Sequence, residues 1–141
     1  MKKVLFIMSA LTLGLVGCGD DIKKNPLVAE WDTPYQTPPF SEIKLEHYEP
    51  AIDYAIELNR AEIDAIINNP EAPTFENTIV AMEQAGSLLG RVTGVFFVLN
   101  NCSTSDQMQQ IALNITPKLT ELSNDVALNP ELFARVKAVY E

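Results

Sequence analysis

The chain has 141 residues, with nineteen acidic side chains against ten basic ones and a formal net charge of −9. A surface this acidic repels phosphate backbones, and no basic patch interleaved with aromatic residues is present, so nucleic acid is excluded as a partner. One histidine and two cysteines leave little material for metal or nucleophilic chemistry. The residues alone therefore indicate an acidic module and leave its function open.

The first eighteen residues have the features of an export signal. Lys2 and Lys3 form a positive start, residues 4–13 are mostly apolar, and the stretch ends at Gly17-Cys18. That ending resembles the bacterial lipoprotein signal, in which cleavage leaves the cysteine as the lipidated first residue. We therefore predict a signal peptide over residues 1–17, lipidation at Cys18, and an exported protein anchored to a bacterial membrane, periplasmic or at the outer surface. The alternative is an ordinary secretory signal with an incidental cysteine.

Removal of the signal changes the charge and the cysteine count. The mature chain loses two lysines, so eight basic residues face nineteen acidic ones and the formal charge becomes −11. With Cys18 acylated, only Cys102 remains, and no intrachain disulfide can form. We expect Cys102 to behave as a small apolar residue at a helix end. No apolar run follows Cys18, so the membrane anchor would be lipid and not peptide.

Residues 18–45 are predicted to form an extended tether that docks on the body. Four prolines disfavour helix there: Pro26, Pro34, Pro38 and Pro39. Trp31, Tyr35 and Phe40 are spaced along the segment, and we expect them to pack it against the helices. Contact with a ligand is the alternative role for these aromatic residues.

A helix is predicted from about Glu46 to Asn68. Its apolar stripe is spaced by threes and fours and includes Tyr48, Ile52, Ile56, Ile63 and Ile66 or Ile67. Pro50 is compatible with a helix because it lies in the first turn. Residues 68–73 contain two asparagines and two prolines, which predict the end of this helix and a turn.

One long helix is predicted from Thr74 to Leu99. Thr74 can cap it, and Glu76 suits the positive end of the helix dipole. Gly86, Gly90 and Gly94 recur at four-residue steps, each costing about 1 kcal/mol of helix propensity. We expect close approach by a neighbouring helix to offset that cost. A membrane-spanning dimerisation stripe is excluded because charged and polar residues interrupt the run; these are Glu83, Gln84 and Arg91.

Two more helices are predicted before the sequence stops. Thr104 with Gln107 resembles a capping box, and an apolar stripe follows that runs to about Val126, with a kink expected at Pro117. The fourth helix begins at Asn129-Pro130 with a cap and a first-turn proline. It shows no glycine, proline or polar turn that would end it. The apolar stripes of the four predicted helices can bury one another only in part. We therefore expect an all-α helical region, residues 46–141, that belongs to something longer.

Reactive chemistry is scarce, and the residues nominate no catalytic and no metal-binding position. His47 is the only histidine, and a single histidine at a helix start is expected to be structural. The carboxylates of Glu42, Glu46 and Glu49 could form an acid–base pair or a cation site, but a solvated helix entry explains them more simply. A surface charge cluster accounts for three further residues at helical spacing: Glu57, Arg60 and Asp64.

The order of several short stretches resembles one protein family. Thr74-Phe75-Glu76-Asn77-Thr78-Ile79, followed by Arg91 to Phe97 and by Leu132 to Val136, is the most specific combination. Shorter matches include Asn25-Pro26-Leu27 and His47-Tyr48. In this order they are similar to the N-terminal region of bacterial peptidyl-dipeptidases, in the thimet oligopeptidase family of zinc metallopeptidases. The likeness covers roughly residues 25–141.

The resemblance implies the fold and activity of a larger enzyme. It implies an all-helical, two-lobed protein with a deep channel, in which the N-terminal helices form part of one wall and oligopeptides are the substrates. Zinc would be held by a His-Glu-x-x-His motif and a further glutamate, none of which is in this chain, so the fragment alone is predicted to be inactive. The alternative is a small helical lipoprotein that binds peptides or a protein partner without catalysis.

Overall fold

The computed structural model describes residues 19–141, so the predicted signal peptide and Cys18 lie outside the described residues. Within the described part every regular element is a helix, which confirms the all-α fold class. The longer helices are α2 (Tyr48–Ile67), α4 (Ser87–Cys102), α5 (Asp106–Ala127) and α6 (Pro130–Tyr140). Short elements complete the order: α1 (Gly19–Ile22), η1 (Pro34–Gln36), η2 (Leu45–His47), η3 (Phe75–Val80) and α3 (Ala81–Gln84).

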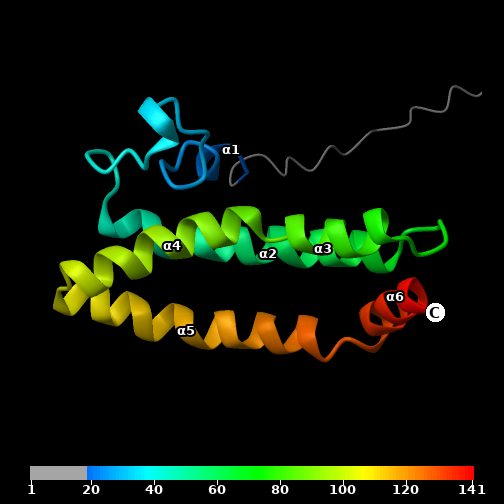
Figure 1. The fold of residues 1–141 in the computed structure, drawn as a ribbon. Coiled ribbons are helices and arrows are strands. Elements are labelled where there is room, and N and C mark those ends of the chain that lie inside the picture. The colour runs from blue at the N-terminus through cyan, green and yellow to red at the C-terminus, as the bar shows by residue number, and fades with distance from the viewer. Residues whose placement is uncertain (1–18) are drawn as a thin grey trace, which may run out of the picture.

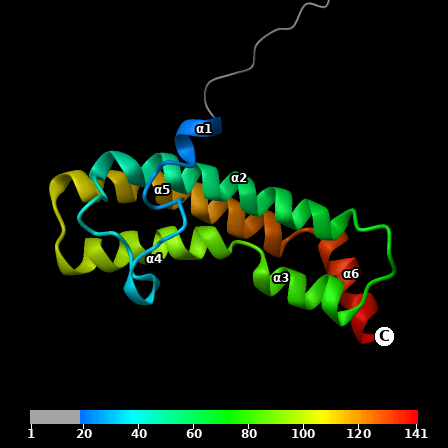
Figure 2. The same ribbon diagram turned by 90° about the horizontal axis from the view of Figure 1, so that it is seen from above.

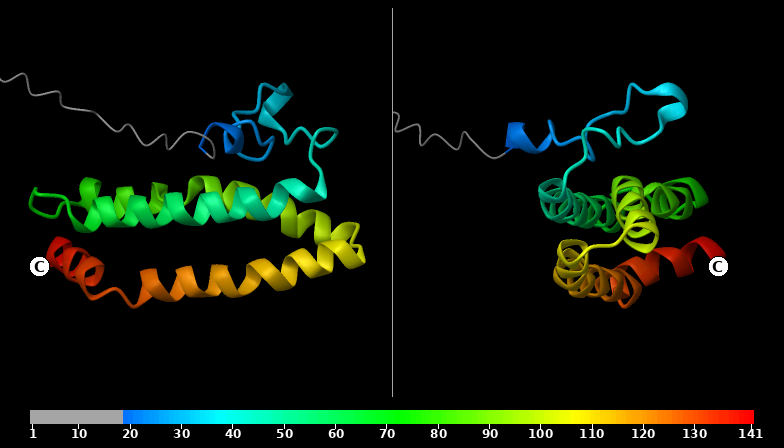
Figure 3. Two further views of the ribbon diagram at one scale, coloured as in Figure 1. Left: turned by 180° about the vertical axis from the view of Figure 1, so that it is seen from behind. Right: turned by 90° about the vertical axis from the view of Figure 1, so that its left-hand side faces the viewer.

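The helices form two layers. Helix α2 lies beside α3 and α4 in one layer, and α5 with α6 forms the other, as the end-on view in Figure 3 shows. Residues 19–45 lie on the side of the first layer that faces away from α5 (Figure 1). Among residues 19–141, none of the helices combines the length and apolar character that a membrane crossing requires.

Helix α2 is the central element and matches its prediction. Its buried stripe includes the predicted Tyr48, Ile52, Ile56 and Ile63, because residues three and four apart share one face. Pro50 lies in the first turn, where its missing N–H leaves no bond unmade. The helix ends in the predicted turn, where the Asn68 side chain donates to the Asp64 carbonyl at 2.8 Å.

The prediction of one long helix over residues 74–99 is wrong. A break at Ala85 and Gly86 separates η3 and α3, which come before it, from α4, which follows it (Figure 2). Ala85 is extended at ψ 138°, and Gly86 is left-handed at φ 77°. The predicted start is confirmed, because the Thr74 hydroxyl accepts the Asn77 backbone N–H at 3.1 Å.

The explanation predicted for the three glycines also fails. An added Cβ at Gly90 or Gly94 would meet no atom within 4 Å, so neither glycine makes room for a neighbouring helix. Gly86 has a different role. Its positive φ is strained for any residue with a side chain, and an added Cβ would lie 2.7 Å from the Asn59 amide nitrogen. The glycine therefore permits the break between α3 and α4.

The starts of α5 and α6 differ in how well they match prediction. The cap of α5 is Ser105, whose hydroxyl accepts the Met108 N–H at 3.2 Å, and not the predicted Thr104. Pro117 lies within α5, which runs on as one element to Ala127. Asn129 caps α6 as predicted, accepting two backbone N–H groups ahead of the first-turn Pro130.

The N-terminal segment is only partly the extended tether that was predicted. It contains turns and short helices, and its anchor is Leu27, which is fully buried in the main core. Trp31 packs against that core as predicted. Tyr35 and Phe40 do not, because their side chains are 99% and 56% exposed. Tyr35 lies within η1 and has a left-handed φ of 60°.

The apolar interior is divided in two. A large cluster joins α2, α4 and α5 around Phe96 and Tyr48, whose rings meet edge to face at 5.1 Å. A smaller cluster, Ile63, Ile66 and Leu132, holds the last turns of α2 against α6. The break at Gly86 lies between the helices that contribute to these two clusters. Helix α4 packs in the large cluster, and α3 packs against the smaller one.

Candidate functional site

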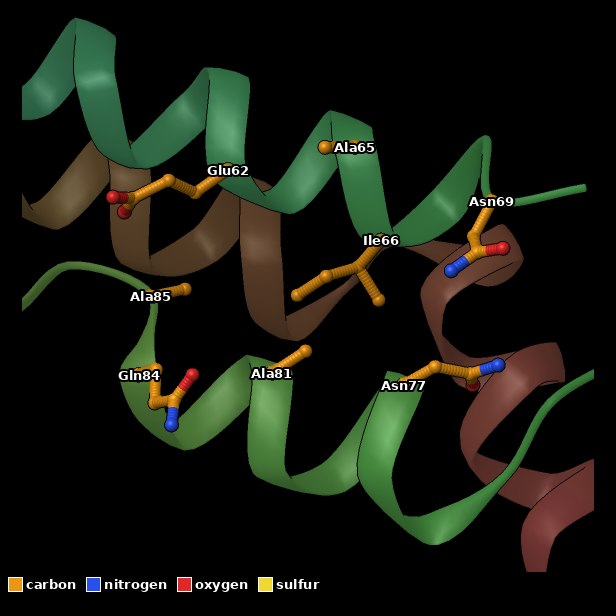
Figure 4. Close-up of a pocket in the computed structure, with 8 residues that line it drawn as sticks. All are labelled: Glu62, Ala65, Ile66, Asn69, Asn77, Ala81, Gln84 and Ala85. Carbon is orange, nitrogen blue, oxygen red and sulfur yellow. The ribbon is translucent and has the colours of Figure 1, made fainter. Parts of the chain in front are cut away.

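One groove in the described part of the chain lies between α2 and the segment formed by η3 and α3. It is an open groove with a volume of about 400 Å³, and Figure 4 shows the residues that line it. Glu62 and Gln84 lie at one end, and Asn69 and Asn77 lie across from each other at the opposite end (Figure 4). The floor between them is apolar and mostly small, formed by Ala65, Ile66, Ala81 and Ala85.

Local hydrogen bonds occupy most of the groove's polar groups. Glu62 accepts the Gly86 backbone N–H at 2.7 Å and so holds the break between α3 and α4. Asn77 accepts the Thr74 N–H at 2.8 Å and donates to the Ala72 carbonyl at 2.9 Å. Asn69 accepts the Glu71 N–H at 2.9 Å. A nucleophile with a paired base is missing from this lining, so the groove suits packing or binding and not bond cleavage.

Arg135 bridges the two asparagines at that end of the groove. From α6 its guanidinium donates to the Asn69 carbonyl at 2.9 Å and to Glu71 and Asn77 at 3.4 Å. The planar fork thereby joins α6 to the turn after α2 and to the start of η3. This role was missed in the sequence. The signal that could have revealed it is a single arginine among the apolar residues of the fourth helix.

Arg91 makes a comparable connection between α4 and the N-terminal segment. Its guanidinium donates to the carbonyls of Leu27, Val28 and Ala29 at 3.1, 2.8 and 3.2 Å. It also lies over the Trp31 ring, 4.6 Å from the ring centre. A cation within an apolar helical stripe needs a partner, and here that partner is the backbone of the N-terminal segment.

His47 has the structural role that was predicted. Its Nδ1 accepts the Lys44 backbone N–H at 3.0 Å, at the short helix η2 that leads into α2. The carbonyl of His47 accepts the Asn25 side-chain amide at 2.9 Å. The histidine therefore fixes the entry to α2 and the start of the N-terminal segment together.

The structure does not bring the acidic candidates together as a site. Glu49 accepts the Asn114 amide at 3.0 Å across to α5, whereas Glu46 lies 3.8 Å from the Lys44 ammonium. Among residues 19–141, three or more His, Cys, Asp or Glu side chains nowhere gather closely enough to hold a metal ion. The described residues therefore do not fit the zinc that the resemblance implies, and no catalytic step can be derived through them.

The charge cluster on α2 extends to the neighbouring layer. Arg60 forms an ion pair with Asp125 of α5. This hydrogen bond, together with the charges of Asp125, Glu121 and Glu57, raises the pKa of the Arg60 guanidinium despite slight desolvation. The pair is partly exposed, so its contribution to stability is expected to be small. Cys102 lies at the end of α4 as predicted, with an exposed side chain.

Comparison with known proteins points to one class, the bacterial peptidases. The chain is 48% identical over 117 residues to dipeptidyl carboxypeptidase of Salmonella typhimurium and 47% identical to that of Escherichia coli, covering 83% of this chain. Oligopeptidase A of Salmonella typhimurium is 29% identical over 109 residues, 77% of this chain. No family model matches the chain.

The chain belongs to the family of dipeptidyl carboxypeptidase and oligopeptidase A, and it corresponds to an N-terminal part of such a peptidase. This confirms the family that the residues indicated. The chain spans about 17% of the length of the dipeptidyl carboxypeptidases and about 15% of oligopeptidase A.

Proposed function

We propose that this chain is the N-terminal helical part of a zinc-dependent peptidyl-dipeptidase, which removes dipeptides from the C-termini of oligopeptides. The observation that carries the proposal is the 47–48% identity over 117 residues to two dipeptidyl carboxypeptidases. In this proposal the zinc is held by residues outside this chain, and the helices described here form part of the substrate-channel wall.

Exposed apolar side chains support a role as one part of a larger protein. Leu128, Phe133 and Tyr140 are 80%, 66% and 79% exposed. Phe133 and Tyr140 are seven residues apart on α6, so they share one face of that helix. Exposed aromatic residues on one face are typical of a surface that packs against further polypeptide, which here would be the rest of the same peptidase.

Peptide hydrolysis tests the proposal. We would assay the longer polypeptide that carries this chain, and the chain alone, on oligopeptides, following dipeptide release by mass spectrometry. We expect the longer protein to release C-terminal dipeptides, to lose activity with a chelator and to regain it with zinc. The chain alone should release none. Chelator-sensitive hydrolysis by the chain alone would overturn the placement of the metal, and no dipeptide release by the longer protein would overturn the activity.

We further propose that the protein is exported and lipid-anchored at Cys18. The basic start, apolar run and Gly17-Cys18 ending support this location. Fatty-acid labelling and membrane fractionation of the unsubstituted protein and of a Cys18→Ser variant test it. We expect label and membrane association only in the unsubstituted protein. Equal membrane association of both proteins would contradict a lipid anchor.

A further inference from the structure

Resting on the lipid anchor proposed above, we infer that the protein is held close to the bilayer in one orientation. The side of the protein that carries residues 19–45 faces the lipid, and the layer formed by α5 and α6 faces away from the bilayer. The inference depends on a docked segment that we call the latch, residues 25–31. If the latch is closed, the connection between the acylated cysteine and the folded body is much shorter than the predicted tether of residues 18–45.

Several independent contacts hold the latch closed. Leu27 is fully buried in the main core, and Arg91 donates to three consecutive carbonyls of the latch while it stacks on Trp31. The indole N–H of Trp31 donates to the Pro26 carbonyl at 2.8 Å. Asn25 ties the first residue of the latch to the entry of α2 through the His47 carbonyl at 2.9 Å.

The short connection limits how the body can turn. Six residues, 19–24, separate Cys18 from Asn25, the first residue of the latch, and even fully extended this connection would reach only about 25 Å. Four of them form α1, which shortens the reach. A tether free to residue 45 would instead reach roughly 90 Å. Because the latch lies on the side of α2 and α4 opposite α5, the short connection brings that side to the bilayer (Figures 1 and 3).

The net charge gives no attraction that would hold the protein against an anionic bilayer. The mature chain carries a formal charge of −11, so an anionic lipid surface would repel it. On a neutral phosphatidylcholine bilayer this repulsion is absent, so an orientation set by the connection should not depend on ionic strength.

The test measures the distance of two surface positions from the bilayer. The acylated protein, in a Cys102→Ser background, is reconstituted in phosphatidylcholine vesicles that carry an energy-transfer acceptor on the lipid headgroups. A donor fluorophore is placed at Glu30→Cys in the latch or at Asn124→Cys on α5, both exposed positions. We expect higher transfer from position 30 than from position 124, at low and at high salt. Equal transfer from the two positions would overturn the inference.

Two insertion variants distinguish a closed latch from a free tether without altering the core. Twenty Gly/Ser residues inserted after Lys24 lengthen the connection, and we expect the difference between the two positions to be lost. The same insertion after Gln36 lies beyond the latch, so the difference should persist. If both insertions abolish the difference equally, the latch is open and the inference fails.

The outcome is distinct from that of the proposed activity. Dipeptide release is measured in detergent, where no bilayer orients the protein, so a failed orientation test leaves the peptidase proposal standing. Absence of an acyl chain on Cys18 would overturn the orientation and the anchor together, without bearing on hydrolysis.

Discussion

The Arg91 guanidinium lies 4.6 Å from the centre of the Trp31 ring while it donates to three carbonyls of the same segment. The two residues are sixty positions apart in the sequence. One planar cation thus satisfies backbone groups that docking would otherwise leave unpaired, and it covers an aromatic face at the same time. The N-terminal segment is part of the fold because of this arrangement and the burial of Leu27.

Replacing Arg91 with lysine should therefore destabilise the protein. Lysine keeps the charge but cannot reach three carbonyls and stack as a plane, and we expect a loss of about 1–2 kcal/mol in the free energy of unfolding. Urea denaturation measures it, and limited proteolysis should show earlier cleavage within residues 25–45. Arg60→Lys is the matched control, since the Arg60–Asp125 pair is partly exposed and its change should stay below about 0.5 kcal/mol. Equal losses in both variants would contradict a special role for Arg91.

Leu27 should be the apolar anchor of the same segment. Truncation to alanine leaves a cavity in the main core, and we expect a loss of about 2–4 kcal/mol, measured by urea denaturation. Leu128→Ala provides the control, because Leu128 is 80% exposed and Leu27 is fully buried. A Leu27→Ala protein as stable as the Leu128→Ala protein would show that the segment is not docked in solution.

The glycines of the broken helix should respond in opposite directions. Gly86→Ala forces a side chain into φ 77° and against Asn59, so we expect a loss of about 1–2 kcal/mol. Gly90→Ala places a methyl group in open space on α4, and it should stabilise by about 0.5–1 kcal/mol. Thermal or chemical denaturation distinguishes the two. Stabilisation by both substitutions would instead favour one unbroken helix.

Tyr48 should make stability fall at alkaline pH. Burial raises the pKa of its hydroxyl above the ordinary value of about 10, so the folded protein keeps a proton that the unfolded chain releases. Its contribution to stability is therefore present below pH 10 and is lost as the pH rises toward the higher folded-state pKa. Tyr48→Phe should flatten the decline in unfolding free energy above pH 10, measured by urea denaturation across pH. Tyr35→Phe, at a 99% exposed ring, should leave the profile unchanged.

Several features could be predicted from the sequence. They are the all-α class, the apolar stripe of α2, the caps at Thr74 and Asn129, and the peptidase family. Each depends on residues close together in the chain: three- and four-residue spacing, a capping side chain beside its own helix, or short runs in a fixed order. The structural role of His47 was also accessible, because its partner Lys44 lies three residues away.

Only the tertiary structure decided where the long helix breaks and which residues hold the segments together. The left-handed Gly86 depends on Asn59 and Glu62 of another helix, and Arg91 and Arg135 find their partners more than fifty residues away. The apolar spacing continues across the break, so it gives no local signal there. Such contacts follow from how two helices pack, and the spacing of residues along one helix does not contain that information.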